Sequence, residues 1–411
     1  MLSPSEIEGA AALPRAGETN HKGRTMKRAD RRKVMLSLGA IVAATVQLAY
    51  APGAMAADPV KIGLALPLSG AAATYGQELQ RGAEYAADLV NQRGGILGGR
   101  KIELVFEDEK GTPQGGVAAV QKLMSVGRVK AITGGTNSSV VLAESSVTKK
   151  RILQVNAGAQ ADAITDQGSP WLFQVNNTVS LNSESFNAYV VKTLKPKSVA
   201  YMGENSEFNK TVLEKLKASL QAAGIELVST STYDAETNDF TSILTKIKAS
   251  NPDMIYVADA YPARAAQLWK QVRQLGGFKI EVMSPGVVTP GMIKPSEGAM
   301  NGVITGEIFM ASDPGAEGKE FVENYQKKFN SSPGKGELVI FEAINLIAAA
   351  MDKAGTDSDY DKISKVIREN SWPSPRGLLK FDEKGRARAP YFYIQRVENG
   401  AVVQVERVSS N

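Results

Sequence analysis

The stretch Ala131-Ile132-Thr133-Gly134-Gly135-Thr136-Asn137-Ser138-Ser139-Val140-Val141-Leu142-Ala143 decides the fold of this chain. It begins with apolar residues, turns at two glycines, and continues with apolar residues at helical spacing. Glycine allows the tight backbone conformations of such a turn and lets a ligand come close to the backbone. The order therefore predicts a strand, a glycine-rich turn and the start of a helix.

The residues that follow the two glycines are all of the types that cap helices: Thr136, Asn137, Ser138 and Ser139. A helix start offers unpaired N–H groups and a partial positive charge, both of which favour anions. The hydroxyls of Ser138 and Ser139 can also donate hydrogen bonds to a carboxylate. Because one residue is enough to cap a helix, we predict an anion site here. The alternative is that these residues only cap the helix.

The N-terminal region has the order of a secretory signal peptide. A basic segment and an apolar run together occupy residues 26–50, and they are followed by the small-x-small site Ala54-Met55-Ala56. This order predicts a cleaved signal over residues 1–56 and a periplasmic location, with Met1 and Met26 as alternative starts. A pair of arginines in the basic segment leaves twin-arginine export open beside the general secretory route.

Removal of this signal limits the chemistry of the mature chain. His21 is the only histidine, and the chain has no cysteine. The mature chain therefore lacks disulfides, Ser–His and Cys–His nucleophilic pairs and nearly all zinc or redox-metal sites, and we expect no cofactor. Its charges nearly balance, so we expect neither nucleic acid nor an anionic membrane as a partner.

Apolar strand segments alternate with helical segments along the rest of the chain. The expected strands are 60–66, 102–106, 129–133, 152–155, 198–202, 226–231 and 254–257, and the expected helices include 113–126, 180–194, 207–223, 240–250 and 263–275. Such alternation predicts an α/β protein with parallel sheets covered by helices. The length fits two domains of ordinary size better than one.

Several short motifs occur in an order and spacing typical of one family. They are Lys61-Ile62-Gly63, Gly70, Tyr75-Gly76, Asn91-Gln92-Arg93-Gly94-Gly95-Ile96, Glu107-Asp108, the stretch 134–139, Asp239-Phe240, Gly377 and Phe381-Asp382-Glu383-Lys384-Gly385. With them, residues 58–411 resemble a periplasmic substrate-binding protein of the leucine/isoleucine/valine-binding type, which serves an ATP-binding-cassette importer.

The resemblance implies a type I periplasmic binding protein fold, with two doubly wound parallel-sheet lobes joined by a three-crossing hinge. By similarity, lobe one is 58–177 plus 309–387, and lobe two is 178–308 plus 388–411. Ligands of open α/β sheets bind beyond the carboxyl ends of the strands, where the stretch 134–139 is expected. The implied partners are a small carboxylate ligand and the membrane permease of the importer, and we expect the mature protein to be a monomer.

The resemblance also implies a set of ligand-binding residues: Tyr75, Ser138, Ser139, Gly158, Gln160, Phe208, Asp259, Tyr261 and Gly286. Gln160 stands where the family often has Ser or Thr, although an amide can still donate and accept. Phe208 stands where Tyr is frequent, so it can stack but cannot hydrogen-bond. The alternatives are that Tyr75 and Phe208 are packing residues and that Gly158 and Gln160 belong to an ordinary loop.

Two positions bear on the identity of the ligand. The family's ammonium-binding acid, usually Glu, falls at Gly286, so it is missing here. Asp259 follows a strand and either faces a ligand cation or caps the helix that begins near Pro262. We expect an amino acid of branched-chain type, or a larger one that uses the space left at Gly286, and keep a keto acid, an aromatic acid or an amide as the alternative.

Other classes of protein fit less well. The first strand is not followed by the Gly-x-Gly-x-x-Gly of dinucleotide-binding enzymes. Glu107 and Asp108 are adjacent on a strand and point to opposite faces, which does not suit a carboxylate-only hydrolase. We therefore expect no enzyme. A periplasmic ligand sensor remains open, because a sensor presents the same closed lobes to its receptor.

Overall fold

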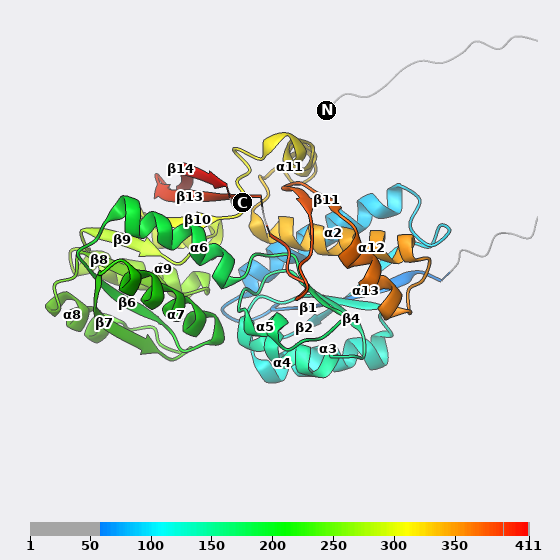
Figure 1. Ribbon diagram of the computed structural model, residues 1–411, viewed down its shortest axis with the longest axis horizontal. Coiled ribbons are helices and arrows are strands. Elements are labelled where there is room, and N and C mark those ends of the chain that lie inside the picture. Colours follow the sequence, from blue (N-terminus) through cyan, green and yellow to red (C-terminus); the bar gives the residue numbers. More distant parts are fainter. Residues whose placement is uncertain (1–57, 389, 410–411) are drawn as a thin grey trace, which may run out of the picture. The chain divides into compact units, whose positions relative to one another are not determined.

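The computed structural model describes residues 58–388 and 390–409 (Figure 1). The predicted signal peptide at 1–56 lies outside these residues. Within the described ranges, no helix combines the length and the apolar character that a membrane span requires.

A five-stranded parallel sheet forms from the first part of the chain, in the order β2-β1-β3-β4-β5. Its strands are β1 (Val60–Leu66), β2 (Ile102–Asp108), β3 (Ala131–Gly134), β4 (Leu153–Asn156) and β5 (Leu172–Gln174). In the register, Gly134 pairs with Ala65 on one side and with Asn156 on the other. The loops that follow β1, β3 and β4 therefore leave the sheet at the same edge, as the strand-end argument predicts.

Helices cover both faces of this sheet, and Figure 1 shows α2 and α12 on one side with α3 and α4 on the other. The helical elements of this part are α2 (Ala73–Gln92), α3 (Pro113–Lys122) with a π-helical turn at Leu123–Gly127, α4 (Ser138–Thr148), α5 (Ala163–Asp166), α11 (Gly315–Phe329), α12 (Lys335–Ala354) and α13 (Tyr360–Glu369). A short ribbon of β11 (Trp372–Ser374) and β12 (Gly377–Leu379) follows them. Gly82 permits close packing of α2 on α12, because a Cβ there would lie 2.4 Å from the carbonyl oxygen of Glu337.

A second, seven-stranded sheet has the order β14-β13-β10-β9-β8-β6-β7. Its strands are β6 (Ser198–Glu204), β7 (Glu226–Tyr233), β8 (Met254–Ala258), β9 (Ile280–Met283), β10 (Ile304–Glu307), β13 (Tyr391–Glu398) and β14 (Ala401–Ser409). The pairs β10–β13 and β13–β14 are antiparallel, which the expectation of purely parallel sheets did not include. The last two strands form a hairpin at Asn399-Gly400, where both residues have positive φ, as a two-residue hairpin turn requires.

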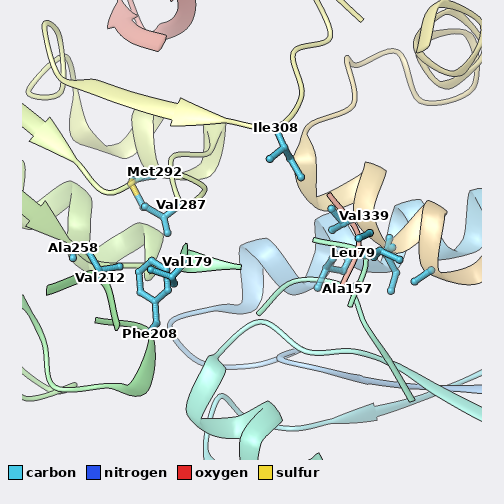
Figure 2. Packing of buried hydrophobic residues seen from close by; sticks show 14 of the residues in the cluster. Leu79, Ala157, Val179, Phe208, Val212, Ala258, Val287, Met292, Ile308 and Val339 are labelled. Carbon is cyan, nitrogen blue, oxygen red and sulfur yellow. The ribbon is translucent and has the colours of Figure 1, made fainter. Parts of the chain in front are cut away.

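The second sheet has its own helices: α6 (Val179–Tyr189) with a π-helical turn at Val190–Leu194, α7 (Glu207–Ala222), α8 (Thr241–Ala249), α9 (Pro262–Gln274), α10 (Pro290–Ile293) and a 3₁₀ turn at Lys294–Ser296. Large side chains such as Trp269, Tyr201 and Tyr256 are fully buried among these elements. Figure 2 shows Met292, Val287 and Phe208 on the side of the second sheet.

The chain passes between the two sheets three times: between β5 and α6, between β10 and α11, and between β12 and β13. Figure 2 shows Ile308, at the second passage, between the apolar side chains of the two parts. The fold class is therefore the predicted one, two α/β units joined by three crossings. We propose that these units are lobe one, 58–177 plus 309–387, and lobe two, 178–308 plus 388–411.

Candidate functional site

A cavity of about 650 Å³, part of it open to solvent, lies at the carboxyl ends of the parallel strands of both sheets. Among the predicted site residues, those that line it are Tyr75, Ser138, Gly158, Gln160, Phe208, Tyr261 and Gly286. Ser139 and Asp259 do not line it. Lobe one and lobe two thus contribute side chains to the same cavity.

Ser138, the first residue of α4, is buried against the loop that follows β4. Its Oγ accepts hydrogen bonds from the backbone N–H groups of Gln160, at 3.3 Å, and Ala161, at 3.1 Å. Because a hydroxyl has two acceptor lone pairs and one hydrogen, these bonds leave the hydrogen free to be donated into the cavity. Ser138 therefore has a hydrogen that it can donate at the cavity, and its binding of a ligand carboxylate stays a prediction.

Ser139 lies away from the cavity and connects the two lobes. Its backbone N–H donates to the side chain of Asn137, the N-cap of α4, at 2.8 Å. Its Oγ accepts from the backbone N–H of Glu207 in lobe two at 3.2 Å. Asn137 makes a second contact across the cleft, donating to the hydroxyl of Tyr261. Part of the expected anion site is thus used for capping and for lobe-to-lobe contact.

The loop after β4 is built around Asn156 and close backbone packing. Asn156 bonds both the N–H and the C=O of Ala159, at 3.1 Å and 2.9 Å. A Cβ at Gly158 would lie 2.3 Å from the carbonyl oxygen of Gly135, so the glycine is needed for packing. Gln160 reaches into lobe two, where its Nε2 donates to the carbonyl oxygen of Gly286 at 2.8 Å and its Oε1 accepts from Asn182 at 2.6 Å.

Gly286 does not leave vacant space for a larger ligand, and that expectation is wrong. Its φ is +78°, a conformation that side chains rarely adopt. A Cβ there would lie 2.7 Å from Oε1 of Gln160. Its carbonyl oxygen accepts from Gln160 and also from the ammonium of Lys335. Where the family has an acid, this chain places a glutamine amide and a lysine.

Asp259 is fully buried behind the cavity wall and forms an ion pair with Arg264. Its two oxygens accept from Nε and Nη2 of Arg264 at 2.7 Å and 3.0 Å, from the hydroxyl of Tyr233 at 2.7 Å and from the N–H of Tyr261 at 2.8 Å. Burial works to lower the pKa of Arg264, but these hydrogen bonds to Asp259 raise it above its ordinary value. The structure therefore supports neither expected role of Asp259, because the carboxylate neither faces the cavity nor caps α9.

Two charged residues of the cavity wall, Glu204 and Lys335, are not among the ligand-binding residues predicted from the sequence. Glu204, the last residue of β6, lines the cavity and lies 3.1 Å from Nη2 of Arg264. Lys335, the first residue of α12, also lines it, and its Nζ lies 3.2 Å from Oε2 of Glu307. A signal existed for each. Glu204 ends a parallel strand, where ligands bind, and a lysine at a helix start opposes the helix dipole.

The cavity wall carries two hydroxyl groups without partners among the described residues. The hydroxyls of Tyr75 and Thr289 are buried and have no hydrogen-bond partner among the described residues. Burial, followed by the charges of Glu78, Glu307 and Glu337, raises the pKa of Tyr75 well above its ordinary value. Tyr75 therefore stays neutral and is available to donate to a ligand.

Aromatic and apolar groups form the wall on the side of lobe two. Phe208, near the start of α7, is buried and lines the cavity. The guanidinium of Arg264 lies over the ring of Tyr261, 4.5 Å from its centroid. Ala260, Pro262 and Val287 complete this wall. The cavity thus combines an apolar side with polar groups at defined places, as pockets for small molecules commonly do.

These features describe two α/β units with a cavity lined by residues of both. A model of the periplasmic binding protein family matches residues 59–401. The chain therefore belongs to the periplasmic binding protein family.

Individual relatives agree with this assignment. The leucine-, isoleucine-, valine-, threonine- and alanine-binding protein of Pseudomonas aeruginosa is 26% identical over 349 residues, which cover 85% of this chain and 92% of that protein. Among solved structures, the branched-chain amino acid transporter substrate-binding protein of Streptococcus pneumoniae in complex with isoleucine gives a TM-score of 0.78 at 25% identity, covering 86% of this chain and 100% of that one. An R. palustris solute-binding protein of an ABC transporter, in complex with benzoate, gives 0.79 at 22% identity, covering 85% and 96%, and shows the fold alone.

Proposed function

We propose that this chain is an extracytoplasmic solute-binding protein that captures a small carboxylate ligand, of branched-chain amino acid type, and delivers it to the membrane permease of an ATP-binding-cassette importer. The observation that carries the proposal is the cavity between two α/β lobes, with donors from lobe one facing an apolar wall from lobe two. The named ligands of the Pseudomonas and Streptococcus relatives support the amino-acid type.

A carboxylate suits the donors on the lobe-one side. The hydroxyl of Ser138 and the ammonium of Lys335 both lie on the wall, and hydrogen bonds to a charged group are stronger than those between neutral groups. Phe208 and Val287 offer an apolar surface for an aliphatic side chain on the opposite side. The proposal is binding without chemical conversion, so mass spectrometry of the released ligand should recover it unchanged.

A second candidate ligand is a carboxylic acid without an amine, such as a keto acid or an aromatic acid. The observation in its favour is that neither predicted position offers a free acceptor for an ammonium. Asp259 is saturated by Arg264 and its neighbours, and the carbonyl oxygen of Gly286 already accepts from two donors. An ammonium buried without an acceptor would be costly.

A thermal-shift screen of the mature protein separates the two candidates. Each amino acid is paired with its keto acid, and benzoate-type acids are added. Stabilisation by L-leucine, L-isoleucine or L-valine above their keto acids supports the first candidate. Stabilisation by keto or aromatic acids alone supports the second. Absence of stabilisation by every carboxylate in the screen would overturn the proposal.

The proposal also includes export, a monomeric state and closure of the lobes on the ligand. A ligand that contacts both lobes favours the closed state, because only that state makes both sets of contacts. Small-angle scattering should then show a smaller radius of gyration with saturating ligand, at a monomer's mass. Uptake of the labelled ligand is measured in cells that lack this protein and in the same cells after the protein is restored. Uptake that depends on the protein indicates a transport component, and uptake that does not depend on it indicates a sensor.

A further inference from the structure

The charges around the cavity are arranged in two groups, and the first lies in lobe two. Arg264 makes two hydrogen bonds to Asp259, at 2.7 Å and 3.0 Å, and a third nitrogen, Nη1, donates to the carbonyl oxygen of Ala235. Because Nη2 carries two hydrogens, it also contacts Glu204 at 3.1 Å while it donates to Asp259. One cation is therefore shared by two carboxylates, with two hydrogen bonds to Asp259 and one contact to Glu204.

The second group spans the two lobes, with Lys335 at the start of α12 in lobe one and Glu307 at the end of β10 in lobe two. Lys335 pairs with Glu307 at 3.2 Å and donates to the carbonyl oxygen of Gly286. An ammonium has three hydrogens, so these two contacts leave one to be donated. Glu307 in turn accepts from the backbone N–H of Ile308 at 2.8 Å. This pair is neutral, and Lys335, which lines the cavity, keeps one hydrogen that these two contacts do not use.

The two groups differ in net charge. Lys335 with Glu307 sums to zero, whereas Arg264 with Asp259 and Glu204 leaves one negative charge in excess. Asp259 accepts four hydrogen bonds and is fully buried behind the wall, so the excess lies on Glu204, the member that lines the cavity. A buried carboxylate that shares its cation with a second carboxylate is a favourable place for another cation.

We propose that Glu204 accepts the ammonium of a zwitterionic ligand, while Lys335 donates to the ligand's carboxylate together with Ser138. This inference rests on the proposed function and narrows its ligand to an α-amino acid. Glu204 is at the end of a lobe-two strand, and Lys335 and Ser138 begin lobe-one helices. The ligand's two charges therefore bind opposite lobes, which makes the zwitterion itself the link that holds the lobes closed.

The placement of loops agrees with this arrangement. The segment that follows Glu204 touches the segment that contains Ser138, since the N–H of Glu207 donates to Ser139 at 3.2 Å. Gln160 connects Ser138 with the surroundings of Lys335. Its N–H donates to Ser138, and its side chain donates to the carbonyl oxygen of Gly286, which also accepts from Lys335. Glu204, Lys335 and Ser138 thus line one cavity and are connected by these loop contacts.

Calorimetric titration of the mature protein and three variants tests the inference. The probes are the tightest-binding of L-leucine, L-isoleucine and L-valine, and the keto acid of the same carbon skeleton. In Glu204→Gln the amino acid should bind about tenfold to a hundredfold more weakly, as expected for loss of a charged hydrogen bond, with the keto acid unchanged or tighter. Lys335→Met should weaken both probes. Glu204→Asp, which keeps the charge, should retain preference for the amino acid.

Glu207→Gln is the matched control, because its side chain pairs with Lys210 on the surface and does not line the cavity. It should bind both probes as wild type does. Equal weakening of both probes in Glu204→Gln, or no change in either, would overturn the role of Glu204. Wild-type binding of the keto acid without the amino acid would also overturn it while leaving the carboxylate function intact. Binding of neither probe, nor of any carboxylate, would overturn both.

Discussion

Replacement of Ser138 by alanine should weaken both the fold of lobe one and the binding of ligand. The hydroxyl accepts from two buried backbone N–H groups, at 3.3 Å and 3.1 Å, and alanine leaves both without an acceptor. A buried polar group without a partner costs about 1–3 kcal/mol. Because Ser138 borders the cavity, water can replace part of the loss, so we expect the free energy of unfolding to fall by about 1–3 kcal/mol in total.

Binding should weaken separately from stability. If the hydroxyl donates to a ligand carboxylate, its loss should cost a further 1.5–3 kcal/mol, about the usual range for hydrogen bonds to charged groups. Urea unfolding without ligand measures the first effect, and calorimetric titration of the folded variant measures the second. Ser139→Ala is the control: its hydroxyl accepts from one partly buried N–H and lies away from the cavity, so it should keep near-normal stability. A Ser138→Ala protein as stable and as tight-binding as wild type would refute the reasoning.

Three other substitutions have defined outcomes. Gly286→Ala forces a side chain into positive φ and against Gln160, so the unfolding free energy should fall by about 2–4 kcal/mol; unchanged stability in urea would contradict this close approach. Burial, together with a neighbouring glutamate, raises the pKa of Glu78 to about 8. The contribution of Glu78 to the free energy of unfolding should therefore be complete below pH 4.5 and should be lost as the pH rises toward 8. Glu78→Gln should remove that part of the pH dependence, and parallel curves for variant and wild type would argue against it. Arg376→Met leaves a buried carboxylate unpaired and should lower stability by about 3–5 kcal/mol, measured by calorimetry; a loss below about 1 kcal/mol would speak against a buried pair.

The parts of the site that follow from strand ends could be predicted from the sequence. The glycine turn at 134–135 and the loop of Gly158 and Gln160 leave adjacent parallel strands at one edge, so their meeting is a consequence of the βα pattern. The same rule applied to β6 would have found Glu204. The alternation of strands and helices also predicted the fold class, apart from the antiparallel hairpin of β13 and β14, which follows from the third crossing of the chain.

Side-chain pairing over long sequence distances could not be predicted in this way. Lys335 donates to Gly286 of lobe two, 49 residues away in the sequence, a tertiary contact that leaves no local pattern. Asp259 was expected either to face a ligand cation or to cap α9, but it pairs with Arg264 of α9 instead. The sequence at Gly286 suggests empty space, whereas Gln160 and Lys335 fill its surroundings.

A crystal structure of the mature protein with the tightest ligand from the carboxylate screen tests the central claim most directly. The account predicts one ligand between the lobes, with its carboxylate within hydrogen-bonding distance of Oγ of Ser138 and Nζ of Lys335. If the ligand is an amino acid, its ammonium should lie at the carboxylate of Glu204. A ligand bound outside this cavity, or one whose carboxylate points away from Ser138 and Lys335 toward solvent, would contradict the account.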